Sequence, residues 1–339
     1  MSEVVAVFAP GSLLAIGEYA VLDGGRALVV AVDSGIECQV APCEHGRRLT
    51  ATDLGLDAPP EALSRTPGAG LLVEAVHAGE KAFPGLAPPH VTVQGRGWGA
   101  GKKIGLGGSA ASVVAILGAF ATAAGQDVTT PAVRRLLLRT AFAVHRAHQN
   151  GRGSGADVAA SIYGGWIDYH LLDSVPHVRA ARVPPGLRLA VAWSGLACST
   201  TASIDRYQRW EAEHAAGGAE PFALSLHRML DRFWAASHDG DRRTFLIALS
   251  EYGLLLEKLA HRIAPEEAEH MEQLTHAAAR SGVASKSSGA VGGDCVIALG
   301  TDGALLDEAR RAWRHLDATV VDVAPDSGGL RPVRLAAGS

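Results

Sequence analysis

The sequence predicts an α+β fold divided into two domains. Three observations support it: strand-like runs mixed with helices fill the first part of the 339-residue chain, residues 203–281 are helical almost throughout, and strand-like runs return after residue 281. Strands and helices grouped in this way are typical of α+β layers. We place the domain boundary near Pro184 and Pro185, so that residues 1–183 form the N-terminal domain and residues 184–339 the C-terminal domain.

The N-terminal strands are short runs of apolar or alternating residues that end at turn-forming residues. A turn is expected at Ala9-Pro10-Gly11, and the polar, Pro-rich segment 44–68 is expected to be a surface excursion. Helical periodicity marks 71–82, and two further helices follow at 109–124 and 131–149, the second opened by Pro131, which favours a first helical turn. The expected strands are 4–8, 12–15, 26–32, 35–40 and 90–94.

The remaining elements follow the same criteria. A glycine-rich segment at 150–155 leads into a helix at 156–162, and strands are expected at 166–171 and 187–193. The long helical region is broken near Gly217-Gly218, Gly240 and Pro265. The chain then returns to strand, turn, strand, helix and strand, and the tail after residue 324 is expected to be mobile. These last elements are 283–287, 294–299, 303–315 and 318–323.

Composition excludes several classes of function. The net charge is −4 and aromatic residues make up 5%, which disfavours a nucleic-acid partner. The four cysteines form no CxxC pair, which indicates reduced thiols rather than zinc ligands or disulfides. The N-terminus lacks the features of a signal peptide, and no apolar run has the length of a membrane span. We therefore expect a cytoplasmic protein without a membrane partner, either monomeric or homodimeric.

The most informative stretch is the glycine-rich loop from Lys102 to Ser112, which runs into the Ala-rich segment 113–124. Glycines allow the backbone to approach an anion, and the first turn of a helix presents unpaired N–H groups and the positive end of its dipole. This pattern predicts a phosphate site. The loop lacks the Gly-Lys-Ser/Thr ending of a P-loop, and a plain turn before a helix is the alternative interpretation.

Four glycine-bearing segments occur in order, at residues 9–25, 102–112, 153–161 and 285–295. Together they resemble the motifs of the kinases named for galactokinase, homoserine kinase, mevalonate kinase and phosphomevalonate kinase. The resemblance implies a two-domain small-molecule kinase fold. Its N-terminal domain would be similar to ribosomal protein S5, its C-terminal domain would be α+β, and ATP and a small phosphate acceptor would bind between them.

The resemblance also implies roles for individual residues. Lys103, Ser109 and Asp157 would be catalytic, with Asp157 as the base toward the acceptor; its alternative role is that of a helix-capping carboxylate. Ser109 and Glu18 would bind Mg²⁺, although Glu18 also fits a solvent-exposed carboxylate at a strand end. The residues implied to hold ATP are Lys102, Gly105, Leu106, Gly107, Gly108, Ser109 and Ala110.

Several segments are most similar to those of phosphomevalonate kinases, among them Lys103–Gly107, Trp193–Thr200 and Lys286–Cys295. The implied acceptor is then 5-phosphomevalonate, and the turn 289–293, which also fits a plain hairpin, would lie near it. Because the second pKa of a phosphate is about 6, this acceptor needs a base less and cations more than an alcohol does. The implied acceptor-binding residues are Glu18, Tyr19, Ser154, Ser199, Thr200, Lys286, Ser288, Gly289 and Ala290.

The chain departs from these motifs at three positions. Ser12 replaces the usual first-motif lysine, Gly108 replaces a serine, and Val291 replaces a glycine. Either another cation, Lys102 or Lys286, supplies the missing charge, or the acceptor differs, or phosphoryl transfer is weakened. Lys103 and Arg152 also lie in or beside the motifs and could supply positive charge toward the acceptor. A mevalonate or other small-alcohol kinase, and a non-catalytic nucleotide-binding sensor, remain alternatives. His145 and His148 have metal-capable spacing, but we interpret them as part of a polar helix face.

Overall fold

The structure is a computed structural model that describes residues 4–44, 46–97, 104–218 and 220–334. Two compact units divide it. Unit 1 consists of the described parts of 1–12, 31–165 and 326–339, and unit 2 consists of 13–30 and 166–325. Two long strands, β1 (Val5–Ile16) and β2 (Arg26–Pro42), each pass from one unit into the other.

The sheet of unit 1 has the strand order β12-β1-β2-β5-β3-β4. β5 (Pro89–Arg96) pairs antiparallel with β2, from Gly35 opposite Arg96 to Pro42 opposite Pro89. β3 (Arg48–Ala51) pairs parallel with β5, so the chain has to cross over between these two strands. The other short elements here are η2 (Thr52–Leu54), β4 (Leu56–Ala58), α1 (Pro60–Leu63) and β12 (Arg331–Pro332).

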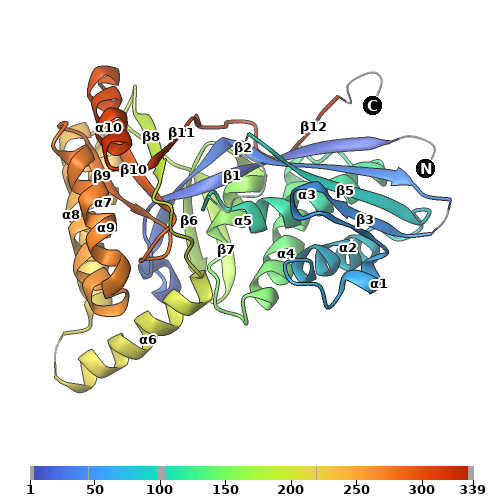
Figure 1. Ribbon diagram of the computed structural model, residues 1–339, viewed down its shortest axis with the longest axis horizontal. Helices are drawn as coiled ribbons and strands as arrows, with labels where there is room; N and C mark the ends of the chain where they lie inside the picture. Colours follow the sequence, from blue (N-terminus) through green and yellow to red (C-terminus); the bar gives the residue numbers. More distant parts are fainter. Residues whose placement is uncertain (1–3, 45, 98–103, 219, 335–339) are drawn as a thin grey trace. The chain divides into compact units, whose positions relative to one another are not determined.

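The helices of unit 1 pack around α3 (Gly108–Ala123), which contacts α2 (Gly70–Ala82), α4 (Pro131–His148) and α5 (Ala156–Tyr163) (Figure 1). Every residue of α3 from Ala110 to Ala121 is buried, so this helix is apolar on all sides. Its small side chains permit close packing, as does Gly79 of α2, where a Cβ atom would lie 2.6 Å from the ring of Phe120. The core therefore fixes the position of the first turn of α3.

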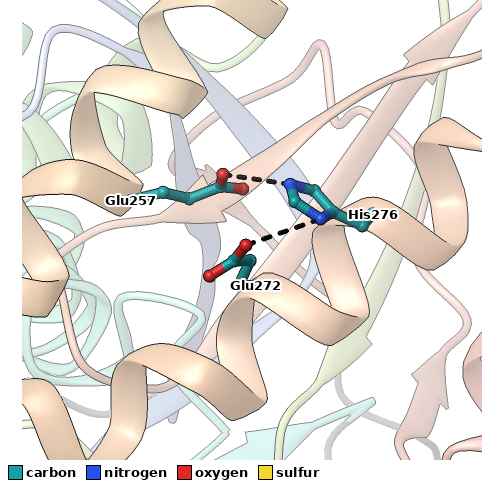
Figure 2. Close-up of side chains that lie close together, drawn as sticks. All are labelled: Glu257, Glu272 and His276. Atoms are coloured by element: carbon teal, nitrogen blue, oxygen red, sulfur yellow. Dashed lines mark hydrogen bonds and ion pairs between the residues drawn. The ribbon is translucent and has the colours of Figure 1, made fainter.

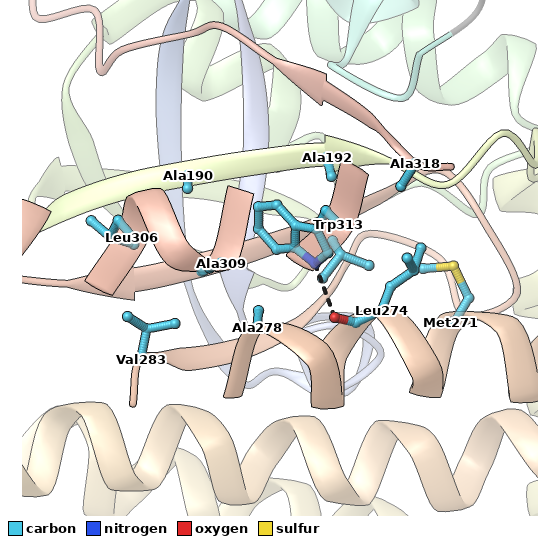
Figure 3. Close-up of a cluster of buried hydrophobic side chains, with 12 residues drawn as sticks. Ala190, Ala192, Met271, Leu274, Ala278, Val283, Leu306, Ala309, Trp313 and Ala318 are labelled. Atoms are coloured by element: carbon cyan, nitrogen blue, oxygen red, sulfur yellow. Dashed lines mark hydrogen bonds between the residues drawn. The ribbon is translucent and has the colours of Figure 1, made fainter. Parts of the chain in front are cut away.

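Unit 2 contains an antiparallel sheet with the order β11-β8-β10-β9. Its strands are β8 (Arg188–Trp193), β9 (Ala284–Ser288), β10 (Cys295–Gly300) and β11 (Thr319–Val321). The fully buried Trp313 lies in an apolar cluster and donates from Nε1 to the carbonyl oxygen of Leu274 at 2.9 Å (Figure 3). The helices of this unit are η1 (Ala20–Asp23), α6 (Thr200–Ala216), α7 (Phe222–Asp239), α8 (Arg242–Ile263), α9 (Pro265–Ala279) and α10 (Gly303–His315).

A hairpin completes unit 2. β6 (Trp166–Leu172) pairs antiparallel with residues 26–30 of β2 and with β7 (Val175–Ala180). The turn between β6 and β7 consists of Asp173 and Ser174, both with positive φ, as a two-residue hairpin loop requires. Among the helices of the described residues, none has both the length and the apolar character needed to cross a bilayer.

The predicted mixture of helices and strands is confirmed, with five corrections. The segment 44–68, expected to be a surface excursion, contains β3, which pairs with β5 and buries Leu49. The turn expected at residues 9–11 is wrong, because β1 continues through them; β2 likewise joins the two strands expected at 26–32 and 35–40. β7 was not predicted. The tail is not mobile as far as residue 334, because Leu330 is fully buried and Val333 donates to the carbonyl oxygen of Ala6 at 3.0 Å. The boundary predicted after residue 183 falls within unit 2 and stays a prediction about independently folding domains.

Candidate active site

The glycine loop of unit 1 leads directly into α3, as the sequence indicates. Gly105 and Gly107 have φ values of 73° and 68°, a region that other residues rarely adopt. Gly107 is also confined, because a Cβ atom there would lie 2.6 Å from the Oγ atom of Ser12. The backbone N–H of Ser12 donates to the carbonyl oxygen of Leu106 at 2.9 Å. β1 therefore supports the loop through Ser12, which is 5% exposed.

The first turn of α3 offers groups that suit an anion. The first N–H groups of a helix have no intrahelical partner, and the dipole places partial positive charge there. The N–H of Ala111 in this turn donates to the carbonyl oxygen of Gly107 at 3.0 Å. Ser109 is exposed in the same turn. Lys102 and Lys103, predicted to stand beside this turn, lie outside the described residues.

Three helices bring Ser109, His145 and Asp157 together. The Oγ atom of Ser109 on α3 lies 3.1 Å from the Nε2 atom of His145 on α4. The same Nε2 atom lies 3.9 Å from the Oδ2 atom of Asp157 on α5. The carboxyl of Asp157 is 31% exposed, and its Oδ1 atom accepts from the N–H of Val158 at 2.8 Å. A hydroxyl and a carboxylate that the family motifs single out are thus linked by one imidazole.

Gly155 allows Asp157 to lie close to Ser109 and His145. Gly155 precedes α5 with a φ of 74°, and a Cβ atom there would lie 2.3 Å from the ring of Phe142 on α4. Only glycine permits both this backbone conformation and this close approach. Asp157 then falls in the first turn of α5, where the helix dipole stabilises a negative charge.

The interpretation of His145 as part of a polar helix face is wrong. His145 is 2% exposed, and its Nδ1 atom has no hydrogen-bond partner among the described residues. His148 does fit that interpretation, because its side chain is 43% exposed and lies 3.4 Å from Glu74. The sequence distinguishes the two histidines by the helix face on which each lies. His145 shares its face of α4 with three buried apolar residues that lie seven, four and three positions earlier, namely Leu138, Ala141 and Phe142.

In unit 2, Glu18 and Lys286 form a buried ion pair. Glu18 is 2% exposed and Lys286 is fully buried on β9. Burial raises the pKa of Glu18 and lowers the pKa of Lys286, and the charge of each partner opposes that effect on the other. The Oε2 atom of Glu18 has no hydrogen-bond partner among the described residues. Neither side chain is a surface group, so Lys286 lies too deep in unit 2 to act as a mobile surface cation.

The ion pair organises the glycine turn that follows β9. The N–H of Gly289 donates to the Oε1 atom of Glu18 at 3.3 Å, and the N–H of Val291 donates to the hydroxyl of Tyr19 at 3.0 Å. The hydroxyl of Tyr252 donates to the carbonyl oxygen of Glu18 at 2.6 Å. Glu18 and Tyr19, which are adjacent in the first glycine-bearing segment, therefore both hydrogen-bond to the fourth segment.

The other residues predicted to bind the acceptor occupy varied positions. Ser288 is buried and donates to the carbonyl oxygen of Leu14 at 3.0 Å, whereas Ala290 is partly exposed. Ser199 and Thr200 are exposed at the start of α6, and Ser199 caps this helix by accepting from the N–H of Ala202 at 3.4 Å. Ser154 belongs to unit 1, where its hydroxyl accepts from the N–H of Ala156 at 3.3 Å. Their roles toward an acceptor stay predictions.

Comparison with known proteins gives two family matches. The N-terminal domain of the GHMP kinases matches residues 71–165, and the C-terminal domain of the GHMP kinases matches residues 233–318. The first match includes Ser109, His145 and Asp157, and the second includes the C-terminal part of α7, all of α8 and α9, and Lys286.

Individual relatives cover nearly the whole chain. The phosphomevalonate kinase of Streptomyces sp. (strain CL190) is 28% identical, over 95% of this chain and 97% of its own. The mevalonate kinase of Aeropyrum pernix is 26% identical, over 87% and 88%. Among solved structures, the phosphomevalonate kinase of Streptococcus pneumoniae in complex with phosphomevalonate and AMPPNP superposes with a TM-score of 0.78 at 20% identity, covering 98% of this chain and 100% of that one.

Proposed function

Because the chain belongs to the GHMP kinase family, we propose that it transfers the γ-phosphoryl group of ATP to the phosphate of 5-phosphomevalonate. The products are ADP and 5-diphosphomevalonate. An oxygen of the acceptor phosphate forms the new P–O bond, and the bond between the β–γ bridging oxygen and the γ-phosphorus breaks. The single observation that carries the proposal is that Ser109, in the first turn of α3, and Asp157, in the first turn of α5, both face the Nε2 atom of His145.

In this proposal the loop before α3 holds the phosphates of ATP. Phosphoryl transfer depends mainly on positioning and on neutralising charge, and both are available from backbone N–H groups at a helix N-terminus. The positive φ values of Gly105 and Gly107 let the backbone follow the phosphate chain. Ser12 holds the loop in place from β1 but contributes no positive charge.

Mg²⁺ fits the oxygen donors of this site. Ser109 is exposed and Asp157 is partly exposed, and oxygen donors of this kind, with substrate phosphates and water, are what Mg²⁺ prefers. Ser109 would hold the ion; Glu18 fits this role less well, because its Oε1 atom already accepts from Gly289 and pairs with Lys286. When bound, the metal supplies charge neutralisation at the phosphates.

Asp157 is proposed to orient the acceptor and to take any remaining proton from its phosphate. Because that phosphate is largely ionised at neutral pH, the base carries less of the catalysis than it would for an alcohol. His145 is a positioning residue here, since it touches Ser109 and Asp157 rather than the reacting atoms. The charge of the missing first-motif lysine is proposed to come from Lys102 or Lys103, because Lys286 is committed to Glu18.

An acceptor panel tests the proposal. Purified protein receives ATP and Mg²⁺ with 5-phosphomevalonate, mevalonate or galactose, and ADP release is followed. We expect turnover with 5-phosphomevalonate only, and its collapse in Asp157→Asn and Ser109→Ala. An exposed carboxylate on α7, Asp239, provides the control Asp239→Asn, which should keep full activity.

A mevalonate kinase is the second candidate, favoured by the 26% identity to the Aeropyrum pernix enzyme. Turnover with mevalonate alone would establish it in place of our proposal. ATP binding without turnover on any acceptor would instead support a nucleotide sensor, the alternative that the loss of lysine at Ser12 suggests.

A further inference from the structure

Two helices of unit 2 place carboxylates and imidazoles side by side. Glu257 and His261 lie four residues apart on α8, and Glu272 and His276 lie four residues apart on α9. Residues with this spacing share one face of a helix. α8 and α9 pack against each other, so Glu257 of α8 meets Glu272 and His276 of α9 across the helix contact (Figure 2).

The inner atoms of the group converge on the ring of His276. The Oε2 atom of Glu257 lies 3.1 Å from Nε2 of His276, and the Oε1 atom of Glu272 lies 3.7 Å from Nδ1 of the same ring. One donor atom from each of these three residues lies within 4.8 Å of the other two. All three side chains are partly buried, so they are ordered by packing and still accessible to an ion.

Neighbouring side chains hold the outer atoms of both carboxylates. The hydroxyl of Thr275 donates to Oε1 of Glu257 at 2.5 Å, and Nε2 of His261 lies 2.7 Å from Oε2 of Glu272. Partners of this kind orient metal ligands by fixing one end of each group. They leave Oε2 of Glu257 and Oε1 of Glu272 directed toward His276.

We propose that Glu257, Glu272 and His276 form a binding site for a divalent transition-metal ion such as Zn²⁺, which links α8 to α9. Mixed imidazole and carboxylate donors favour Zn²⁺ over Mg²⁺ or Ca²⁺, which prefer oxygen alone. Tetrahedral Zn²⁺ with ligands at about 2.0–2.2 Å requires donors roughly 3.3–3.5 Å apart, so the side chains have to rotate to bring both carboxylates to the same nitrogen of His276. Water takes the fourth position.

The competing interpretation is a set of hydrogen bonds and ion pairs among these histidines and glutamates, with no metal. Ion pairs of this exposure contribute little to stability and need no metal. The two interpretations differ in one measurable property, because only a metal site saturates with one ion per chain and stabilises the folded protein as the ion concentration rises. The site does not depend on the proposed kinase reaction.

Zn²⁺ titration of the metal-stripped, untagged chain tests the proposal by calorimetry. We expect one saturable site in the unaltered protein and its loss in His276→Ala. The matched control is His238→Ala on α7, whose imidazole is 78% exposed and pairs with Asp239, and this variant should bind Zn²⁺ as the unaltered protein does. Removal of the orienting His261 should weaken binding by about 10- to 100-fold.

Two results would overturn the proposal: no saturable Zn²⁺ binding to the unaltered protein, or equal binding in His276→Ala. Should His276→Ala fail to fold, Glu257→Gln keeps the test open, because it removes a ligand charge while conserving shape. The visible absorption of bound Co²⁺ provides an independent readout. A tetrahedral spectrum is expected in the unaltered protein, and an unchanged spectrum in Glu257→Gln would contradict the ligand set.

Discussion

The Nε2 atom of the buried His145 lies 3.1 Å from the hydroxyl oxygen of Ser109 and 3.9 Å from a carboxylate oxygen of Asp157. One side chain of α4 therefore links the helix that carries the proposed phosphate site to the helix that carries the proposed base. The three groups come from three packed helices. A shift of one helix against another would therefore also change the distances among these three side chains.

Replacement of His145 should lower turnover without weakening ATP binding. His145→Ala removes a buried hydrogen bond and leaves a cavity, so we expect kcat to fall by about 10- to 100-fold and stability by about 1–3 kcal/mol. KM for ATP should stay unchanged, because our proposal gives the imidazole no contact with the nucleotide.

Two further variants separate positioning from stability. His145→Gln keeps a polar atom near Ser109 and should restore part of kcat, whereas a purely structural role would give the two variants the same kcat. His148→Ala, on the exposed face of the same helix, should change neither kcat nor stability.

Loss of the Asp157 carboxylate should reduce turnover most. For Asp157→Asn we expect kcat lower by about 10²- to 10⁴-fold, the usual range for a general acid or base, and nearer the low end if the acceptor is an ionised phosphate. Steady-state ADP release measures this change. A decrease below tenfold would show that Asp157 only caps α5.

A methyl group at Gly107 should disturb the proposed phosphate loop. Gly107→Ala forces a positive φ at a cost of about 1–2 kcal/mol and brings Cβ to 2.6 Å from Ser12, so we expect KM for ATP to rise about tenfold. Gly125→Ala is the matched control, because Gly125 has a φ of 76° but open space around it. The double variant Gly107→Ala, Ser12→Ala should recover part of the affinity; no recovery would contradict the proposed contact.

Removal of one partner of the Glu18–Lys286 pair should strongly destabilise the folded protein. Lys286→Met leaves a buried carboxylate without its counter-charge and should destabilise the protein by about 3–5 kcal/mol in urea unfolding. The exposed pair of Arg311 with Glu308 is the control, and Arg311→Met should cost less than about 1 kcal/mol.

The stability of Lys286→Met should also change with pH in a defined direction. Burial raises the pKa of Glu18 above its ordinary value of 4.5, and loss of Lys286 removes the charge that opposes this rise. The folded state then binds the proton more tightly than the unfolded state, so stability should fall as pH rises above 4.5. If the stability of Lys286→Met has the same pH slope as the unaltered protein, Glu18 is not desolvated as described.

Local rules predicted the glycine loop and α3 well. A Gly-rich segment followed by Ala-rich chain specifies a buried helix through propensity alone, and 109–124 was expected where Gly108–Ala123 is found. Pro131 likewise marks the start of α4. Helix breaks at Gly240 and Pro265 were also correct, because these residues interrupt a helix whatever surrounds them.

Tertiary contacts explain what local rules missed. Ala9-Pro10-Gly11 resembles a turn, yet β1 continues through it because Gly35 of β2 lies against it, where a Cβ atom would be 2.2 Å from the carbonyl oxygen of Ala9. The burial of His145 and Lys286 was not predicted, because their partners, Ser109 and Glu18, are remote in sequence. Burial of a polar side chain depends on such remote partners, which spacing does not reveal.

Phosphorus NMR of the product tests the central claim most directly. The chain is incubated with ATP, Mg²⁺ and 5-phosphomevalonate, and the spectrum is followed as ADP appears. We predict that the single phosphomonoester resonance of the acceptor is replaced by two coupled diphosphate resonances, at a rate that Asp157→Asn lowers. ADP formation with an unchanged acceptor resonance would contradict the proposed acceptor. So would a new phosphomonoester resonance that forms only in a parallel incubation with mevalonate in place of 5-phosphomevalonate.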